Sequence, residues 1–141
     1  MHESSQLLAA IIAMDEAAVA QGFARVHERD TSPLFYNNEQ ALRAVVKSAL
    51  IAAIGDYARI EELPSGKGFA DVAYLPARGS MQPAILVELK WNKPVDAALA
   101  QMRERRYAEI LDDLDVPALL VGVSYDAKTK EHACSIELHE A

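Results

Sequence analysis

The sequence predicts an α/β domain in which a mixed central β-sheet is flanked by helices. Apolar stripes at helical spacing and short strand-like runs follow one another in the order helix, helix, three strands, helix, two strands. The continuous apolar run 117–125 is typical of a strand that is covered on both faces. With 141 residues, of which 51% are hydrophobic, the chain has enough material for one core.

The N-terminal part of the chain is expected to hold one helix and a linker. Apolar residues at helical spacing extend over 6–21, and Gly22 is a typical C-terminal cap. The polar stretch 27–38 contains a proline, which indicates a loop. We therefore place a helix and linker at 1–30 and the main domain at 31–141.

A helix and three strands open the main domain. Asn37 or Asn38 can cap a helix whose apolar stripe continues to Gly55. Short runs rich in β-branched and aromatic residues follow, separated by turns that contain glycine and serine. These runs predict strands over 57–62, 69–75 and 84–90.

A third helix and two strands complete the order. Pro94 suits the first turn of a helix, and the expected buried stripe of that helix is Val95, Leu99, Met102 and Ile110. After the buried strand 117–125, residues 126–130 predict a turn. Residues 132–138 then alternate between apolar and polar, as an edge strand does.

Composition limits the class of protein. No stretch approaches the roughly 20 apolar residues that a membrane-spanning helix needs. The apolar run 7–13 lacks a basic flank and is followed by Asp15 and Glu16, so it does not resemble a secretion signal. We therefore expect a cytoplasmic protein. The single cysteine, Cys134, excludes an internal disulfide and is expected to pack in a strand rather than act as a nucleophile.

Two acidic strand motifs are the strongest indication of chemistry. Glu88 and Lys90 lie two residues apart on the predicted strand 84–90, so their side chains share one face, roughly 6 to 7 Å apart along the backbone. Asp71 opens the preceding apolar run, and a hairpin-like pairing of the two strands would bring it beside Glu88. Two converging carboxylates with an adjacent lysine suit a hard divalent cation that activates water against a phosphate.

An ordinary ion pair on an exposed strand face is the alternative for Glu88 and Lys90. Glu88, however, interrupts an otherwise buried run, where an unpaired charge is expensive.

Element order and motifs together resemble the PD-(D/E)XK nuclease superfamily, which has a restriction-endonuclease-like core. More narrowly, four segments look like the nuclease-type domain at the C-terminus of bacterial AAA-ATPase-like proteins, namely 62–71, 87–92, 98–107 and 120–126. The resemblance covers roughly residues 30 to 138. It implies an αβββαβ core, here with an extra N-terminal helix and a C-terminal edge strand. Ala70 stands where the family motif has proline, at a position that carries no chemistry.

The resemblance implies a Mg²⁺ or Mn²⁺ site. Asp71 and Glu88 would be metal ligands, with the backbone carbonyl of Leu89 as a third. Lys90 would orient or deprotonate the attacking water and offset charge on the phosphate. Glu39 matches the place of an extra acid that holds the metal through water, although a first-turn acid favoured by the helix dipole is an equal explanation.

Several residues are candidates for substrate contact. Gln101 and Arg105 are four residues apart and share a helix face from which they could reach a phosphate. Lys67 is another candidate phosphate contact. Trp91 could stack on a base, although packing at the sheet edge is the more frequent outcome.

The resemblance implies nucleic acid as substrate, with DNA favoured over RNA, and an AAA-ATPase domain as partner. It predicts no membrane partner, and it leaves a homodimer open. The net charge of −7 argues against a broad nucleic-acid footprint. The alternative function is therefore a non-catalytic binding or regulatory module that keeps the nuclease fold.

Overall fold

The computed structural model describes residues 2–30, 39–50, 57–65, 68–77, 79–104 and 116–140. Within these residues, four helices and one five-stranded sheet are present. The elements, in chain order, are α1 (His2–Ile12), α2 (Glu16–Asp30), α3 (Glu39–Ala49), β1 (Tyr57–Ser65), β2 (Gly68–Pro76), β3 (Ala84–Trp91), α4 (Val95–Glu104), β4 (Ala118–Asp126) and β5 (Glu131–His139).

The sheet is mixed, with strand order β1-β2-β3-β4-β5. Strands β1, β2 and β3 form an antiparallel meander, and β5 returns antiparallel to β4. The central pair β3 and β4 is parallel, so the chain must cross over between them, and α4 lies in this crossover. The predicted α/β class with a mixed sheet and flanking helices is confirmed.

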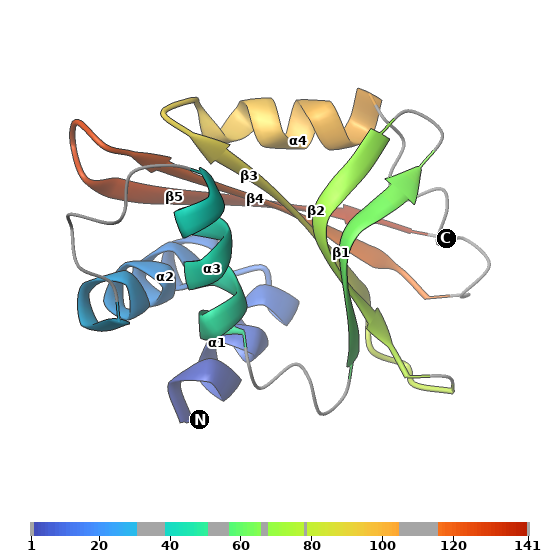
Figure 1. Cartoon of the computed structure of the whole chain (residues 1–141). Helices are drawn as coiled ribbons and strands as arrows, with labels where there is room; N and C mark the ends of the chain where they lie inside the picture. The colour runs from blue at the N-terminus through green and yellow to red at the C-terminus, as the bar shows by residue number, and fades with distance from the viewer. Residues whose placement is uncertain are drawn as a thin grey trace.

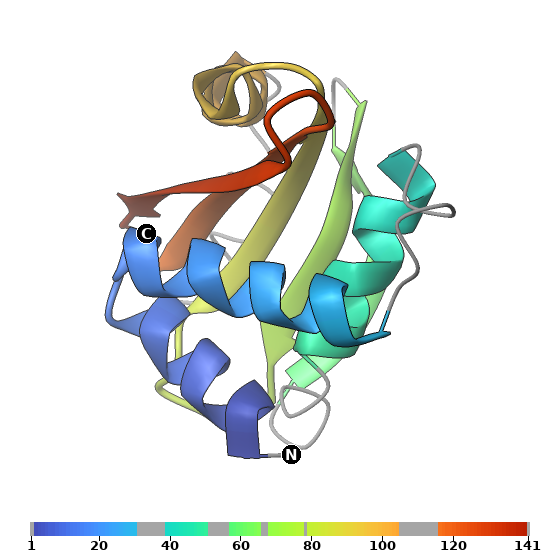
Figure 2. The same ribbon diagram turned by 90° about the vertical axis from the view of Figure 1, so that its left-hand side faces the viewer.

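Helices cover both faces of the sheet (Figures 1 and 2). Helices α1, α2 and α3 lie on one face, and α4 lies on the other. Successive side chains of β3 point to opposite faces of the sheet, so β3 packs against both helix layers. Val87 and Leu89 belong to the larger cluster with α1 to α3, while Leu86 packs with Leu99 and Met102 of α4. The two faces of β3 therefore have different neighbours, and this decides where its polar residues point.

The N-terminal region differs from the prediction, because two helices stand where one was expected. Helix α1 ends at Ile12, and Met14 adopts a left-handed conformation with a φ of 60°. Asp15 then begins the next helix, since its carboxylate accepts a hydrogen bond from the Ala18 backbone N–H at 3.2 Å. The apolar spacing continues through this turn, so periodicity alone did not reveal it.

Gly22 does not cap a helix, and this prediction was wrong. It lies inside α2, where an added Cβ would stand 2.7 Å from Leu7 Cδ1. The missing side chain lets α1 and α2 approach closely. Helix α2 continues to Asp30, so the first part of the predicted loop 27–38 is helical; residues 31–38 lie outside the described residues.

Helices α1 and α2 share the core of the sheet. Their buried residues Leu7, Ile11, Val19, Phe23 and Val26 belong to one cluster with residues of α3 and the sheet. Helix α2 is also fixed to the edge strand, because Glu16 Oε2 accepts a hydrogen bond from the Ile136 backbone N–H at 2.6 Å. These contacts join residues far apart in sequence.

The remaining elements occur where the sequence predicts them, with shifts in their ends. Helix α3 ends at Ala49, whereas its predicted cap at Asn37 or Asn38 and its predicted end at Gly55 lie outside the described residues.

The apolar stripe of α4 is confirmed for Leu99 and Met102. Val95 is only partly buried, and Ile110 lies outside the described residues. Strand β4 is buried along nearly its whole length, and β5 is an edge strand. Over the described parts of the chain, no helix has the length and apolar character that a membrane span requires.

Candidate active site on the α4 face of the sheet

Glu88 and Lys90 lie on the face of β3 that α4 covers. Their neighbours Val87 and Leu89 point into the core beneath α1 to α3, so strict alternation turns Glu88 and Lys90 the other way. Glu88 is only 4% exposed, whereas Lys90 is partly exposed. A buried carboxylate therefore sits beside an ammonium group that solvent can reach.

Gln101 of α4 connects these two side chains. Lys90 Nζ donates a hydrogen bond to Gln101 Oε1, and Gln101 Nε2 donates one to Glu88 Oε1, each at 2.5 Å. The amide thus presents its oxygen to the cation and its N–H to the anion, as the charges require. We call Glu88, Lys90 and Gln101 the bridged cluster.

Gly122 allows α4 to lie close enough for this contact. It pairs with Glu88 in the parallel register of β3 and β4. An added Cβ at Gly122 would stand 3.0 Å from Ala98 Cβ and 3.3 Å from the Val95 carbonyl oxygen. Most other side chains here would push the helix off the sheet beside Glu88. A glycine within an apolar strand is the sequence signal that could have revealed this close approach.

Asp71 occupies β2, next to the bridged cluster in strand register. Val72 pairs with Val87 in the antiparallel register, so one further step along each strand sets position 71 opposite position 88. The side chain of Asp71 lies outside the described part of the structure. Convergence of the two carboxylates therefore stays a prediction, made on the strand register.

Of the other predicted site residues, Leu89 is the one whose side chain the structure describes. Glu39 is the first residue of α3, a helix that packs on the opposite face of the sheet; its side chain is outside the described residues. The Leu89 side chain is buried in the core on that same opposite face. Lys67 and Arg105 lie outside the described residues altogether.

Trp91 belongs to an aromatic group on the α2 side of the sheet. Its ring centroid is 5.0 Å from that of Tyr125, which in turn is 4.7 Å from His132 and 5.4 Å from His27. This supports packing for Trp91 over base stacking. Burial, together with the neighbouring His27, lowers the pKa of His132 to about 4, so its ring is neutral at physiological pH.

Cys134 lies in β5 against the larger core cluster. Burial, with a further contribution from the charge of Glu16, raises the pKa of its thiol to about 12. The thiol is therefore protonated at physiological pH, which supports its packing role over nucleophilic chemistry.

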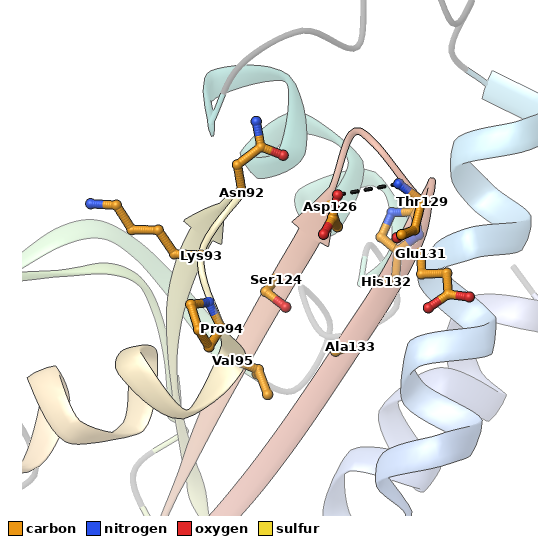
Figure 3. A pocket seen from close by; sticks show the side chains of 10 residues that line it. All are labelled: Asn92, Lys93, Pro94, Val95, Ser124, Asp126, Thr129, Glu131, His132 and Ala133. Carbon is orange, nitrogen blue, oxygen red and sulfur yellow. Dashed lines mark hydrogen bonds between the residues drawn. The ribbon is translucent and has the colours of Figure 1, made fainter.

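A pocket of about 380 Å³ lies at the ends of β3 and β4 (Figure 3). Its wall includes Ser124, which pairs with Lys90 in the sheet register and is only 6% exposed. Three hydrogen bonds hold the rim. Asn92 Oδ1 accepts one from the Ala127 N–H at 2.8 Å, and Asp126 Oδ1 accepts one each from the N–H groups of Lys128 and Thr129. Sequence reasoning did not find this pocket, because it forms between segments that only the sheet brings together.

The chemistry of the bridged cluster fits a hard cation in part. Carboxylate oxygen is the preferred donor for Mg²⁺ and Mn²⁺, and Glu88 supplies one next to the register position of Asp71. In the described part of the chain, no three His, Cys, Asp or Glu side chains gather as a metal site. The side chain of Asp71, the second acid of the proposed pair, lies outside the described residues. Comparison of the chain with models of known families and with curated proteins found no match.

Proposed function

We propose that this protein is a Mg²⁺- or Mn²⁺-dependent nuclease of the PD-(D/E)XK type, which hydrolyses phosphodiester bonds in nucleic acid. The observation that carries the proposal is the buried carboxylate of Glu88 with Lys90 on the same face of β3, next to the register position of Asp71. A buried carboxylate is costly and needs a reason. A catalytic site supplies one.

The arrangement of elements supports the same proposal. Helix α3, the antiparallel strands β1 to β3, helix α4 and the parallel strand β4 follow one another as the αβββαβ order of the resemblance requires. Asp71 lies on β2, and Glu88 and Lys90 lie on β3. Function nevertheless depends on the residues of the site and not on the fold.

The proposed chemistry assigns a role to each residue. Asp71 and Glu88 would hold the cation, with the Leu89 carbonyl as a further oxygen ligand. A bound Mg²⁺ or Mn²⁺ would lower the pKa of a water molecule and polarise the phosphate. Lys90 would orient that water and offset negative charge as it develops on the phosphate oxygens. Arg105 and Lys67 remain candidates for substrate contact.

A non-catalytic module is the competing function, and the net charge of −7 is the observation that favours it. A protein with more acidic than basic side chains attracts phosphate backbones weakly. Cation binding at Asp71 and Glu88 would offset part of this charge locally. We propose DNA rather than RNA as the substrate and an AAA-ATPase domain as the partner.

Cleavage by wild type and Lys90→Ala tests the proposal. Lys90 is partly exposed at the end of a strand, so its truncation leaves no cavity and the variant should still fold, which a thermal melt checks. Cleavage of single- and double-stranded DNA and RNA in Mn²⁺ at low salt should fall by on the order of 100-fold, as loss of an electrostatic stabiliser usually causes. Lys128→Ala, in the exposed turn after β4, is the matched control and should cleave like wild type.

Two results would count against this function. If wild type leaves every substrate intact in both Mg²⁺ and Mn²⁺, with or without an ATPase partner, the binding module is the better account. If Lys90→Ala cleaves as fast as wild type, the protein is a nuclease but the mechanism is wrong.

A further inference from the structure

The bridged cluster poses a problem for the proposed chemistry. Glu88 and Lys90 alternate on one strand face, and a lysine side chain is long enough to fold back onto a carboxylate two residues away. A direct ion pair would place the ammonium on oxygens that a cation needs. It would also take Lys90 away from the water it is proposed to orient.

Gln101 addresses this problem. In the structure, the contact between Glu88 and Lys90 runs through its amide, by the two hydrogen bonds of 2.5 Å described above. The side-chain amide of glutamine is neutral. It accepts a hydrogen bond through its oxygen and donates one through its NH₂ group, whereas a carboxylate only accepts and an ammonium only donates. The Gln101 bond occupies one of about four acceptor positions on the carboxylate.

We infer that Gln101 is a positioning residue that holds the Lys90 ammonium away from the Glu88 carboxylate. This inference rests on the proposed function, and it assigns Gln101 a role other than direct phosphate contact. Helix α4 supplies the rigidity, because Leu99 and Met102 anchor it on either side of Gln101. Gly122 sets the distance, since it lets the helix lie against the sheet beside Glu88.

The test uses Gln101→Met, which keeps an unbranched side chain of similar length and removes both hydrogen bonds. Lys90 should then pair with Glu88 directly. Mn²⁺ affinity, measured by titration calorimetry, should fall by about 10-fold or more, as loss of a supporting contact around a metal typically causes. Arg103→Met introduces the same residue, methionine, at an exposed position of α4. It is the matched control and should bind Mn²⁺ like wild type.

The double variant Gln101→Met/Lys90→Met separates positioning from simple support of the fold. Removal of the competing ammonium should restore Mn²⁺ affinity to within a few-fold of wild type, because substitutions in one hydrogen-bond network are coupled. If the double variant binds as weakly as Gln101→Met alone, Gln101 acts on the fold and the inference is overturned.

A crystal structure of Gln101→Met gives a readout that does not depend on metal binding. The inference predicts an ion pair, with Lys90 Nζ within about 4 Å of a Glu88 carboxylate oxygen. Separate side chains in that variant would overturn it. If wild type binds no Mn²⁺ but the variant forms the ion pair, the proposed function fails while the spacing role of Gln101 stands.

Discussion

Glu88 shows how a charged residue can occupy the middle of a buried sheet. Its side chain is 4% exposed, so removal from water would be costly without partners. The Gln101 amide donates to it, and the nearby Lys90 ammonium supplies opposite charge through the same amide. A charge retained at this cost is typical of functional sites.

The aromatic group around His132 gives a prediction at the same scale. The folded-state pKa of His132 is lowered to about 4, by burial first and by His27 second, against an ordinary value of 6.5. Between these two pH values the unfolded chain binds the extra proton and the folded protein does not. Stability should therefore be full above pH 6.5 and fall as the pH drops toward 4.

Thermal melts of wild type and His132→Gln from pH 7.5 to 4 check this prediction. The variant should show a shallower loss of melting temperature, because the titrating ring is gone. His139→Gln, at the far end of the same strand and outside the aromatic group, serves as the control and should keep the wild-type slope. Equal slopes for His132→Gln and wild type would contradict the assignment.

At the scale of elements, the close contact of α4 with β4 controls the candidate site. Gly122→Ala should destabilise the protein by about 1 to 3 kcal/mol, the usual cost of overpacking, because Ala98 Cβ and the Val95 backbone stand in the way. The same change should weaken Mn²⁺ binding, since it would lift Gln101 from Glu88. Urea unfolding and calorimetry measure the two effects.

Gly22→Ala provides the comparison. Its added Cβ would meet the end of the flexible Leu7 side chain, which can rotate away. Alanine is also favoured over glycine inside a helix by roughly 0.5 to 1 kcal/mol. We expect a net change within about 1 kcal/mol. A larger loss for Gly22→Ala than for Gly122→Ala would contradict this reading of the two helix contacts.

Local patterns predicted much of the sheet and part of the site. Alternation along β3 was sufficient to place Glu88 and Lys90 on one face, because the side-chain period of a strand is fixed. The buried strand β4 and the apolar stripe of α4 could be predicted in the same way, because the layers that bury these side chains require apolar residues there.

Features that depend on contacts between distant segments could not be read in this way. The turn at Met14 interrupts a continuous apolar stripe, and Gly22 serves helix packing instead of capping. The bond from Gln101 to Glu88 depends on how α4 crosses β3 and β4. Likewise, the pocket beside Ser124 exists only because the sheet brings residues 92–95 beside the β4–β5 turn.

The whole molecule has a hydrophobic cluster on each face of the sheet, and the bridged cluster lies on the face that α4 covers. Helices α1 to α3 stabilise the sheet from one side, which leaves the α4 side for the candidate site. The net charge of −7 attracts cations to the acidic positions. The proposed function therefore depends first on the binding of a divalent cation at Asp71 and Glu88.

Titration calorimetry with MnCl₂ measures the binding of the divalent cation directly. Wild type should bind one Mn²⁺, and both Asp71→Asn and Glu88→Gln should abolish binding, because each replaces a charged ligand with a neutral group of the same shape. Glu131→Gln, an exposed acid at the start of β5, should bind like wild type. No Mn²⁺ binding by wild type, or equal binding by all three variants, would contradict the proposed site.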